Sequence, residues 1–178
     1  MPSPIKYAGE IVTADDWNAL TPKLVTQEND QTVTSSTTPI ASEITFTPEP
    51  NAVYEYWLYI SYSATVNSGF FWEWDAPNAL IASFSQALEH PANSGSANTG
   101  QLVVFRRAAH TTNREAGGSD PAGTTPPAQF HSAYDSGTFA TDGTVNAITV
   151  KFAQATSHAD QTILRGGNQT RMLYRRIA

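Results

Sequence analysis

The segment from Val53 to Ala64 constrains the fold of this chain more than any other. Every second position is apolar, so one face would carry Tyr54, Tyr56, Leu58, Ile60, Tyr62 and Ala64. A repeat of two residues is that of a β-strand, whose successive side chains point to opposite faces. The other face is half apolar and carries Val53, Glu55, Trp57, Tyr59, Ser61 and Ser63. A strand covered on one side alternates more strictly, so we expect this strand to be covered on both sides.

Further short segments predict more strands. We expect them at residues 31–35, 42–47, 70–75, 101–107, 134–141, 144–153, 161–165 and 170–177. Asp142-Gly143 is a two-residue hairpin signal, Gly166–Asn168 predicts a second hairpin, and residues 110–127 predict a long loop. The pattern predicts an all-β fold, a jelly-roll β-sandwich over residues 31–178. The side chains expected to point inward are Ile44, Phe46, Tyr54, Tyr56, Leu58, Ile60, Ile148, Val150 and Phe152.

Composition agrees with strands and excludes several classes of protein. Only 15% of the 178 residues are charged, and 11 Gly and 11 Pro favour turns over helices. The absence of cysteine excludes disulfides and thiol chemistry. No apolar run approaches the roughly 18 residues of a membrane helix, and the first residues do not resemble a signal peptide. We therefore expect a soluble protein with no membrane partner and no cleaved export signal.

The net charge of −6 is unevenly distributed. Residues 1–100 hold two basic and eleven acidic side chains, whereas residues 101–178 hold eight basic and five acidic ones. Proteins that bind nucleic acid usually have a basic domain, so we expect no nucleic-acid partner. The arginines near the end of the chain would face solvent or another protein.

Residues 1–30 differ from the rest and predict an N-terminal arm with one short helix. Thr13 and Asp16 have the spacing of a capping box, with Asp in place of Glu or Gln. The helix would run through Trp17 and Leu20 and end before Pro22. Because two helical turns are not stable alone in water, the helix must dock either on the protein's own domain or on a neighbouring subunit.

No group of residues predicts catalysis or a cofactor. His90, His110, His131 and His158 are about twenty or more residues apart and lack the spacing of a metal site. Ser157, His158 and Asp160 are the residue types of a catalytic triad, but triad members normally come from separate segments. Glu55, Glu73 and Asp75 lie beside aromatic residues, as in a sugar cleft, or lie on solvated strand faces. We expect no enzyme activity, no metal and no cofactor.

Nine large aromatic residues lie between Tyr54 and Trp74. Leaving such side chains in water is unfavourable, so we expect part of them to be buried between subunits. The alternative is a wide sandwich core with tyrosine hydroxyls at its edge. Our candidates for the subunit interface are Trp57, Tyr59 and Phe71. We expect a homotrimer joined through a sheet containing Val53–Ala64 and Phe70–Trp74.

Several segments of the sequence resemble those of a known group of virion proteins. Ile44-Thr-Phe-Thr-Pro-Glu-Pro-Asn-Ala-Val-Tyr54 and Tyr56-Trp-Leu-Tyr-Ile-Ser-Tyr-Ser-Ala64 resemble the opening strands of tumour-necrosis-factor-like jelly rolls in tailed-phage virion proteins. Phe152–Thr156 and Arg171–Ala178 resemble the closing strands of these domains. Gly9-Glu-Ile-Val-Thr-Ala-Asp-Asp-Trp-Asn-Ala-Leu20 is similar to the N-terminal segment of many phage tail, fibre and head-decoration proteins.

The resemblance implies a homotrimer in a virion, assembled in the cytoplasm of a bacterial host. The arm would bind the major capsid protein or another virion protein through Ile5, Tyr7, Ile11, Trp17 and Leu20. Capsid decoration is the first expectation, and a minor tail or tail-fibre protein is the second. A carbohydrate-binding module that recognises a host surface glycan is the third, and a glycosidase is the fourth.

Overall fold

The computed structural model describes residues 8–88, 102–107 and 114–178. It contains one helix, α1 (Ala14–Leu20), within these ranges. The strands in them are β1 (Lys23–Thr26), β2 (Gln31–Thr34), β3 (Ile40–Phe46), β4 (Val53–Ala64), β5 (Phe70–Asp75), β6 (Ala79–Leu88), β7 (Leu102–Arg107), β8 (Arg114–Ala116), β9 (His131–Thr141), β10 (Ile148–Ala153), β11 (Gln161–Leu164) and β12 (Arg171–Arg176). The expected all-β fold with one short N-terminal helix is confirmed.

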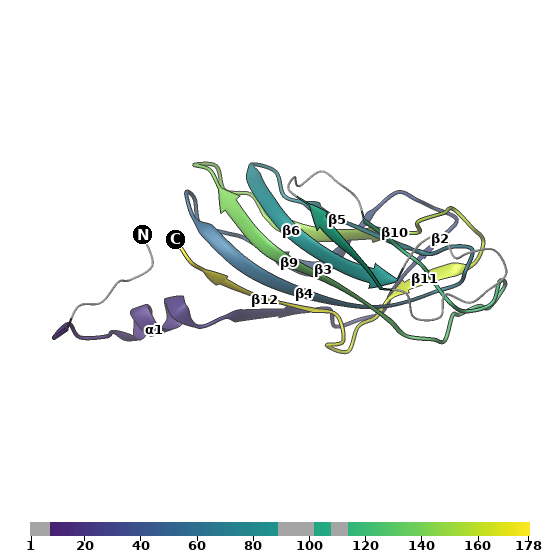
Figure 1. The fold of residues 1–178 in the computed structure, drawn as a ribbon, viewed down its shortest axis with the longest axis horizontal. Helices are drawn as coiled ribbons and strands as arrows, with labels where there is room; N and C mark the ends of the chain where they lie inside the picture. Colours follow the sequence, from purple (N-terminus) through teal and green to yellow (C-terminus); the bar gives the residue numbers. More distant parts are fainter. Residues whose placement is uncertain (1–7, 89–101, 108–113) are drawn as a thin grey trace.

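The strands form two antiparallel sheets that pack face to face (Figure 1). The large sheet has the order β1-β12-β4-β9-β6-β7, and β11 pairs with both β2 and β4 in the same sheet. The small sheet has the order β3-β10-β5-β8. β11 and β12 pair with successive parts of β4, and their partners β2 and β1 lie outside them, so each pair of short strands acts as one interrupted strand.

The topology is that of a jelly roll with one added hairpin. If β6 and β7 are left out, and β1–β2 and β11–β12 are each counted as one strand, eight strands remain, which we number 1 to 8 along the chain. They alternate between the two sheets except at the step from β5 to β8, which both lie in the small sheet. The large sheet then has the order 1-8-3-6 and the small sheet 2-7-4-5. This arrangement is the double Greek key of a jelly roll. β6 and β7 extend the large sheet beyond β9.

The core lies between the two sheets, and all nine side chains expected to point inward are buried there. Alternation along β4 places Tyr56 and Tyr62 in this layer, where Tyr56 stacks on Phe139 with ring centroids 4.3 Å apart and Tyr62 stacks on Phe70 at 4.4 Å. Seven of the nine clustered aromatic side chains are buried within the single chain. Six of them belong to the core cluster between the sheets, Phe71 is buried outside that cluster, and Trp57 and Tyr59 are half-buried.

Neither expected hairpin forms. Asp142-Gly143 carries the chain from β9 in the large sheet to β10 in the small sheet. Both edges of β9 are already occupied by β4 and β6, so no free edge remains for β10. Residues 166–168 likewise do not join a hairpin, because β11 lies between β2 and β4 while β12 lies between β1 and β4. Two-residue turn signals describe the local chain, whereas pairing depends on which edges are free.

Three strands were not expected from the sequence. β6 alternates in burial, but its inward positions include Ser83, Ser85 and Ala87, which give a weak apolar pattern. β8 has three residues and lies inside the expected loop at residues 110–127. β1 belongs to the large sheet although it lies within the expected arm at residues 1–30. The part of the arm that carries no strand therefore ends at Pro22.

Candidate interaction surfaces

The first candidate surface is the projecting arm. The capping box at the start of α1 is confirmed, since Thr13 Oγ1 accepts from Asp16 N at 3.2 Å and Asp16 Oδ2 accepts from Thr13 N at 2.8 Å. The helix ends where Thr21 N donates to Trp17 O, one residue before Pro22. Figure 1 shows α1 beyond the end of the sandwich, at the far end of the chain segment that enters β1.

The arm exposes large apolar side chains. Ile11 is 84% exposed, Val12 55% and Trp17 68%. Val12 precedes the N-cap Thr13 and Trp17 is the fourth helical residue, which are the two positions of a hydrophobic staple. Among the other expected anchoring residues, Ile5 and Tyr7 lie outside the described residues, and Leu20 is the last residue of α1. The structure thus brings Ile11 and Trp17 into one short exposed segment.

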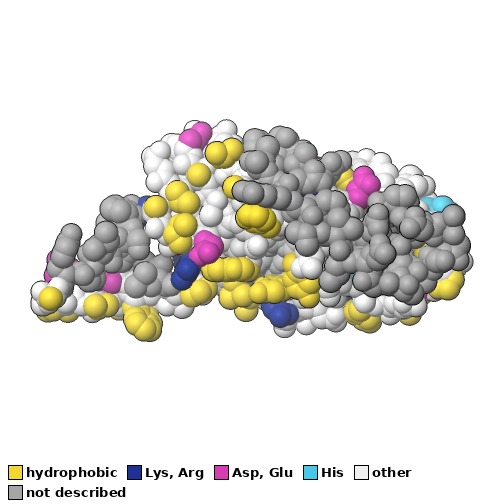
Figure 2. All heavy atoms as spheres, in the orientation of Figure 1, with side chains coloured by type: hydrophobic (Ala, Val, Ile, Leu, Met, Phe, Trp, Pro, Cys, Tyr) yellow, Lys and Arg dark blue, Asp and Glu magenta, His cyan; other side chains and the backbone are white. Residues whose placement is uncertain are grey.

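The second candidate surface is the outer face of the large sheet, which points away from the core. Strand register places one residue from each of five neighbouring strands in a single row, in the order Leu24, Leu173, Trp57, Ser136 and Phe84. Leu24 is 58% exposed and Phe84 51%, while Leu173 and Trp57 are half-buried. We call this set the apolar row. Figure 2 shows hydrophobic side chains gathered over β4 and β12 and others on the projecting arm.

Arginines from β12 flank the apolar row. The guanidinium of Arg175 lies 5.6 Å from the Trp57 ring centroid, and that of Arg171 lies 5.3 Å from the Tyr59 ring centroid. Arg175 also donates to Glu55 at 2.8 Å. The next row of the face pairs Tyr59 with Tyr134, edge to face at 5.7 Å. Over β4 and β12, the outer face therefore combines aromatic and aliphatic side chains with Arg171, Arg175 and Glu55.

Phe71 does not belong to this surface. It lies on β5 in the small sheet, opposite Ala153 and Glu115, and it is only 9% exposed. The expected interface sheet containing Val53–Ala64 and Phe70–Trp74 is wrong, because β4 and β5 are in different sheets. Trp57 and Tyr59 lie on the outer face as their alternation predicts. Leu24, Phe84 and Leu173 were missed, because only strand register places them beside Trp57.

The carboxylates considered for a sugar cleft are divided between the two sheets. Glu55 lies on the outer face of the large sheet, paired with Arg175. Glu73 and Asp75 lie on β5 in the small sheet, where Asp75 forms an ion pair with Lys151 at 2.6 Å. The structure does not bring the three carboxylates together.

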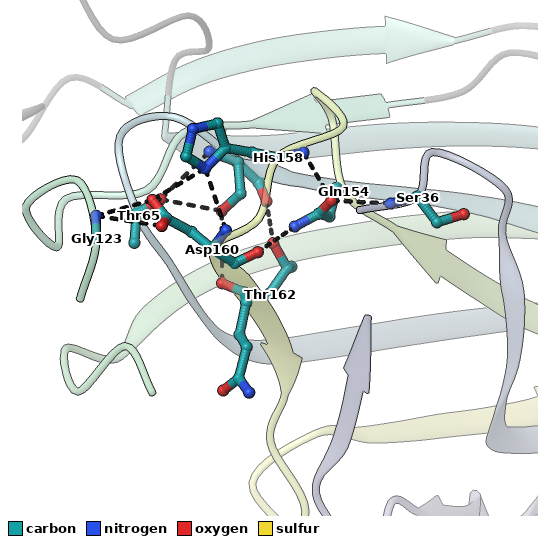
Figure 3. Close-up of polar contacts among 10 residues, drawn as sticks. Ser36, Thr65, Gly123, Gln154, His158, Asp160 and Thr162 are labelled. Atoms are coloured by element: carbon teal, nitrogen blue, oxygen red, sulfur yellow. Dashed lines mark hydrogen bonds and ion pairs between the residues drawn. The ribbon is translucent and has the colours of Figure 1, made fainter. Parts of the chain in front are cut away.

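Asp160 and His158 lie in a polar cluster at the end of the sandwich opposite the arm (Figure 3). The Asp160 carboxylate accepts from Thr65 Oγ1 at 2.8 Å and from Gly123 N at 3.1 Å, and His158 Nδ1 lies 3.2 Å from it. Gln154 Oε1 accepts from the backbone N–H of Ser36 and of His158. Burial alone raises the pKa of Asp160, but the hydrogen bonds from Gly123 and Thr65 and the charge of His158 hold it below its usual value. These contacts tie together loops from both sheets.

A charged pair lies inside the core. Arg114 of β8 reaches across to Asp135 of β9, with Nε 3.1 Å from Oδ2. Tyr56 Oη and Trp72 Nε1 donate to the same carboxylate at 3.0 and 3.2 Å. Burial raises the pKa of Asp135, and the charge of Arg114 and these hydrogen bonds offset only part of that effect. The pair connects the edge of the small sheet to the middle of the large sheet.

His131 lies half-buried beside Ser119, with Nε2 3.2 Å from Ser119 Oγ. Burial lowers the pKa of His131, and the nearby Asp120 opposes that shift in part. Within the described ranges, no three His, Cys, Asp or Glu residues are grouped to hold a metal ion. His90 and His110 lie outside those ranges. The described part of the chain also has no helix long and apolar enough to cross a membrane.

The described features define a jelly-roll β-sandwich with a projecting, capped helical arm. No protein-family model and no curated protein matches the chain. The similarity to VP2 of infectious bursal disease virus, in a subviral particle, covers all of this chain and 42% of the VP2 chain, at 8% identity and a TM-score of 0.20. The proteins of the Gx and Gt strains of this virus match at 10% identity and a TM-score of 0.21. The chain spans about two fifths of the length of these viral proteins.

Proposed function

We propose that the protein is a non-enzymatic structural protein of a tailed-phage virion. Its role would be capsid decoration, with homotrimers on the particle surface that stabilise the shell. The observation that carries the proposal is the projecting arm, whose Ile11 and Trp17 are 84% and 68% exposed. The similarity of residues 9–20 to the N-terminal segments of phage virion proteins supports the same assignment.

The arm supports a role in assembly for an energetic reason. Burying a large apolar side chain fully stabilises a protein by about 1.5–3 kcal/mol, and the domain leaves this contribution unused at Ile11, Val12 and Trp17. The seven residues of α1 are too few for a stable isolated helix. A neighbouring protein in the particle would both cover these side chains and stabilise the helix.

The outer face of the large sheet supports a homo-oligomer. Its apolar row crosses five strands and ends in exposed side chains on both sides, Leu24 and Phe84. Stable subunit interfaces have an apolar centre with aromatic and Arg side chains enriched. Trp57 and Tyr59, with Arg175 and Arg171 beside them, have this composition.

The experiment adds purified protein to particles assembled without it, and measures the bound copies per particle by quantitative mass spectrometry. We expect the full chain to bind and Trp17→Ala to lose at least about 30-fold in affinity, because a buried aromatic anchor contributes about 2–4 kcal/mol. The matched control is Phe130→Ala, which removes an aromatic ring that is 58% exposed in a loop of the sandwich. Equal binding by all three proteins would overturn the role of the arm.

Copy number in the same measurement separates the two virion positions. Hundreds of copies per particle would support decoration of the capsid lattice, whereas a handful would support the alternative of a minor tail or tail-fibre protein. Failure of the full chain to bind any particle would overturn the proposed function as a whole.

A further inference from the structure

We propose that the arm of one copy docks on the outer face of the large sheet of a second copy, so that the two candidate surfaces form one interface. The inference rests on the proposed assembly of several copies in a particle, and it names the partner of the arm as a second copy of this chain. Each copy would give its arm to one neighbour and receive the arm of another.

The arm leaves its own outer face uncovered. Figure 1 shows α1 beyond the end of the sandwich, and the apolar row begins at Leu24, where the chain enters the large sheet from the arm. The exposed fractions of Leu24 and Phe84, 58% and 51%, show that the arm of the same copy does not cover the row. Both halves of an apolar contact are therefore present and open in a single copy.

Charge complementarity selects the second copy as the occupant. Between Tyr7 and Pro22 the chain holds Glu10, Asp15 and Asp16 and no basic residue. The outer face holds Arg171 and Arg175 beside its aromatic rings, with Glu55 as the carboxylate paired to Arg175. An acidic arm with apolar side chains thus matches an apolar face flanked by arginines.

The capping box lowers the cost of this docking. Thr13 Oγ1 already accepts from the Asp16 N–H and the Asp16 carboxylate from the Thr13 N–H, and Val12 and Trp17 occupy the two hydrophobic-staple positions at the start of α1. A segment that is ordered before binding loses less conformational entropy when it binds. Trp17 is the largest exposed side chain of the arm and is the expected anchor.

The contact joins two different patches, so it is a head-to-tail interface. Such interfaces close into rings when the rotation between neighbours permits. A ring of three copies would hold three identical arm-to-face contacts and would give the expected homotrimer. Face-to-face packing of the large sheets would instead leave the arms uncovered.

The test measures the mass of the full chain in solution by light scattering coupled to size-exclusion chromatography. We expect a trimer at micromolar concentration, and an increase of about 30-fold or more in the dissociation constant for Trp17→Ala. Trp57→Ala should have a similar effect, and Phe84→Ser serves as a second variant of the face if Trp57→Ala does not fold. Phe130→Ala, as before, is the control and should remain a trimer.

Mixing the variants gives the decisive result. Trp17→Ala retains an intact face and Trp57→Ala an intact arm, so an equimolar mixture should form a mixed dimer when neither variant associates alone. A monomeric full chain, a trimer that survives Trp17→Ala, or a mixture that stays monomeric would overturn the inference. The particle-binding experiment tests the proposed function separately, because Trp17→Ala could retain its oligomer and still fail to bind particles.

Discussion

The Asp135 carboxylate is buried between the two sheets. It is held by the Arg114 guanidinium and by donors from Tyr56 and Trp72. Arg114 also contacts the hydroxyls of Ser83 and Ser85 on β6. A buried pair of this kind contributes little relative to apolar residues, but removing one partner leaves an uncompensated charge.

We expect Asp135→Ala to destabilise the protein by about 3–5 kcal/mol, because Arg114 would remain buried without its counter-charge. Urea unfolding of Asp135→Ala, Arg114→Ala and the double variant measures the coupling between them. The double variant should cost about 1–3 kcal/mol less than the sum of the two single variants. Additive costs would contradict an energetic coupling across the core.

His131 predicts a dependence of stability on pH. Its pKa is lower in the fold than the unfolded value of about 6.5, so the unfolded chain binds the proton more tightly. The contribution of His131 to the free energy of unfolding is therefore fully present above pH 6.5, and it is lost as the pH drops through 6.5 toward the folded pKa. His131→Gln retains an acceptor for Ser119 N and should lose less stability than the natural chain between pH 7.5 and pH 5.5.

Urea midpoints at both pH values check this prediction. At pH 7.5 His131 is neutral in both the folded and the unfolded chain. The difference in stability between the natural chain and His131→Gln at this pH therefore reports only the contacts that the substitution removes. Equal losses of stability in the two proteins on acidification would show that His131 does not titrate with folding.

At the scale of elements, β9 packs closely against the backbone of its neighbour β6. Gly137 lies in the middle of this strand, opposite Tyr56 on β4 and Ser83 on β6. A Cβ atom at Gly137 would overlap the backbone carbonyl of Ala82, which cannot move without disturbing the strand pair. Glycine is required here by close approach of the neighbouring backbone.

We expect Gly137→Ala to destabilise the protein by about 1–3 kcal/mol through this overlap. Gly143→Ala is the matched control, because a Cβ atom there meets no heavy atom within 4 Å. Thermal unfolding of both variants measures the difference. If Gly137→Ala unfolds at the same temperature as Gly143→Ala, β6 does not pair with β9 in this register.

At the scale of the whole molecule, we expect the stability of the sandwich to be independent of the projecting arm. Removal of residues 1–22 deletes no strand and none of the buried core residues. Removal of residues 1–26 also deletes β1, which pairs with β12 and packs Val25 against the core. The boundary between dispensable and required residues thus lies between Pro22 and Gln27.

We expect the chain without residues 1–22 to retain its unfolding free energy within about 1 kcal/mol. The chain without residues 1–26 should lose about 2–4 kcal/mol, because it loses strand hydrogen bonds and the burial of Val25. Denaturant unfolding at a concentration where the full chain is monomeric compares the three proteins. If the chain without residues 1–22 lost much of its unfolding free energy, the arm, including Trp17, would stabilise the protein's own domain.

The sequence by itself determined the features that depend on neighbours along the chain. Alternation assigned the two faces of β4, and Thr13, Asp16 and Pro22 set the bounds of α1. The tertiary structure decided which strands pair, because each edge accepts one partner and β4 and β6 occupy both edges of β9. It also placed Phe71 in a different sheet from Trp57 and assembled the apolar row from residues more than a hundred positions apart, such as Leu24 and Leu173. The face to which a side chain points follows from local periodicity along one strand. Which side chains lie next to each other on that face follows from strand register, which is set only when strands distant in the sequence pair.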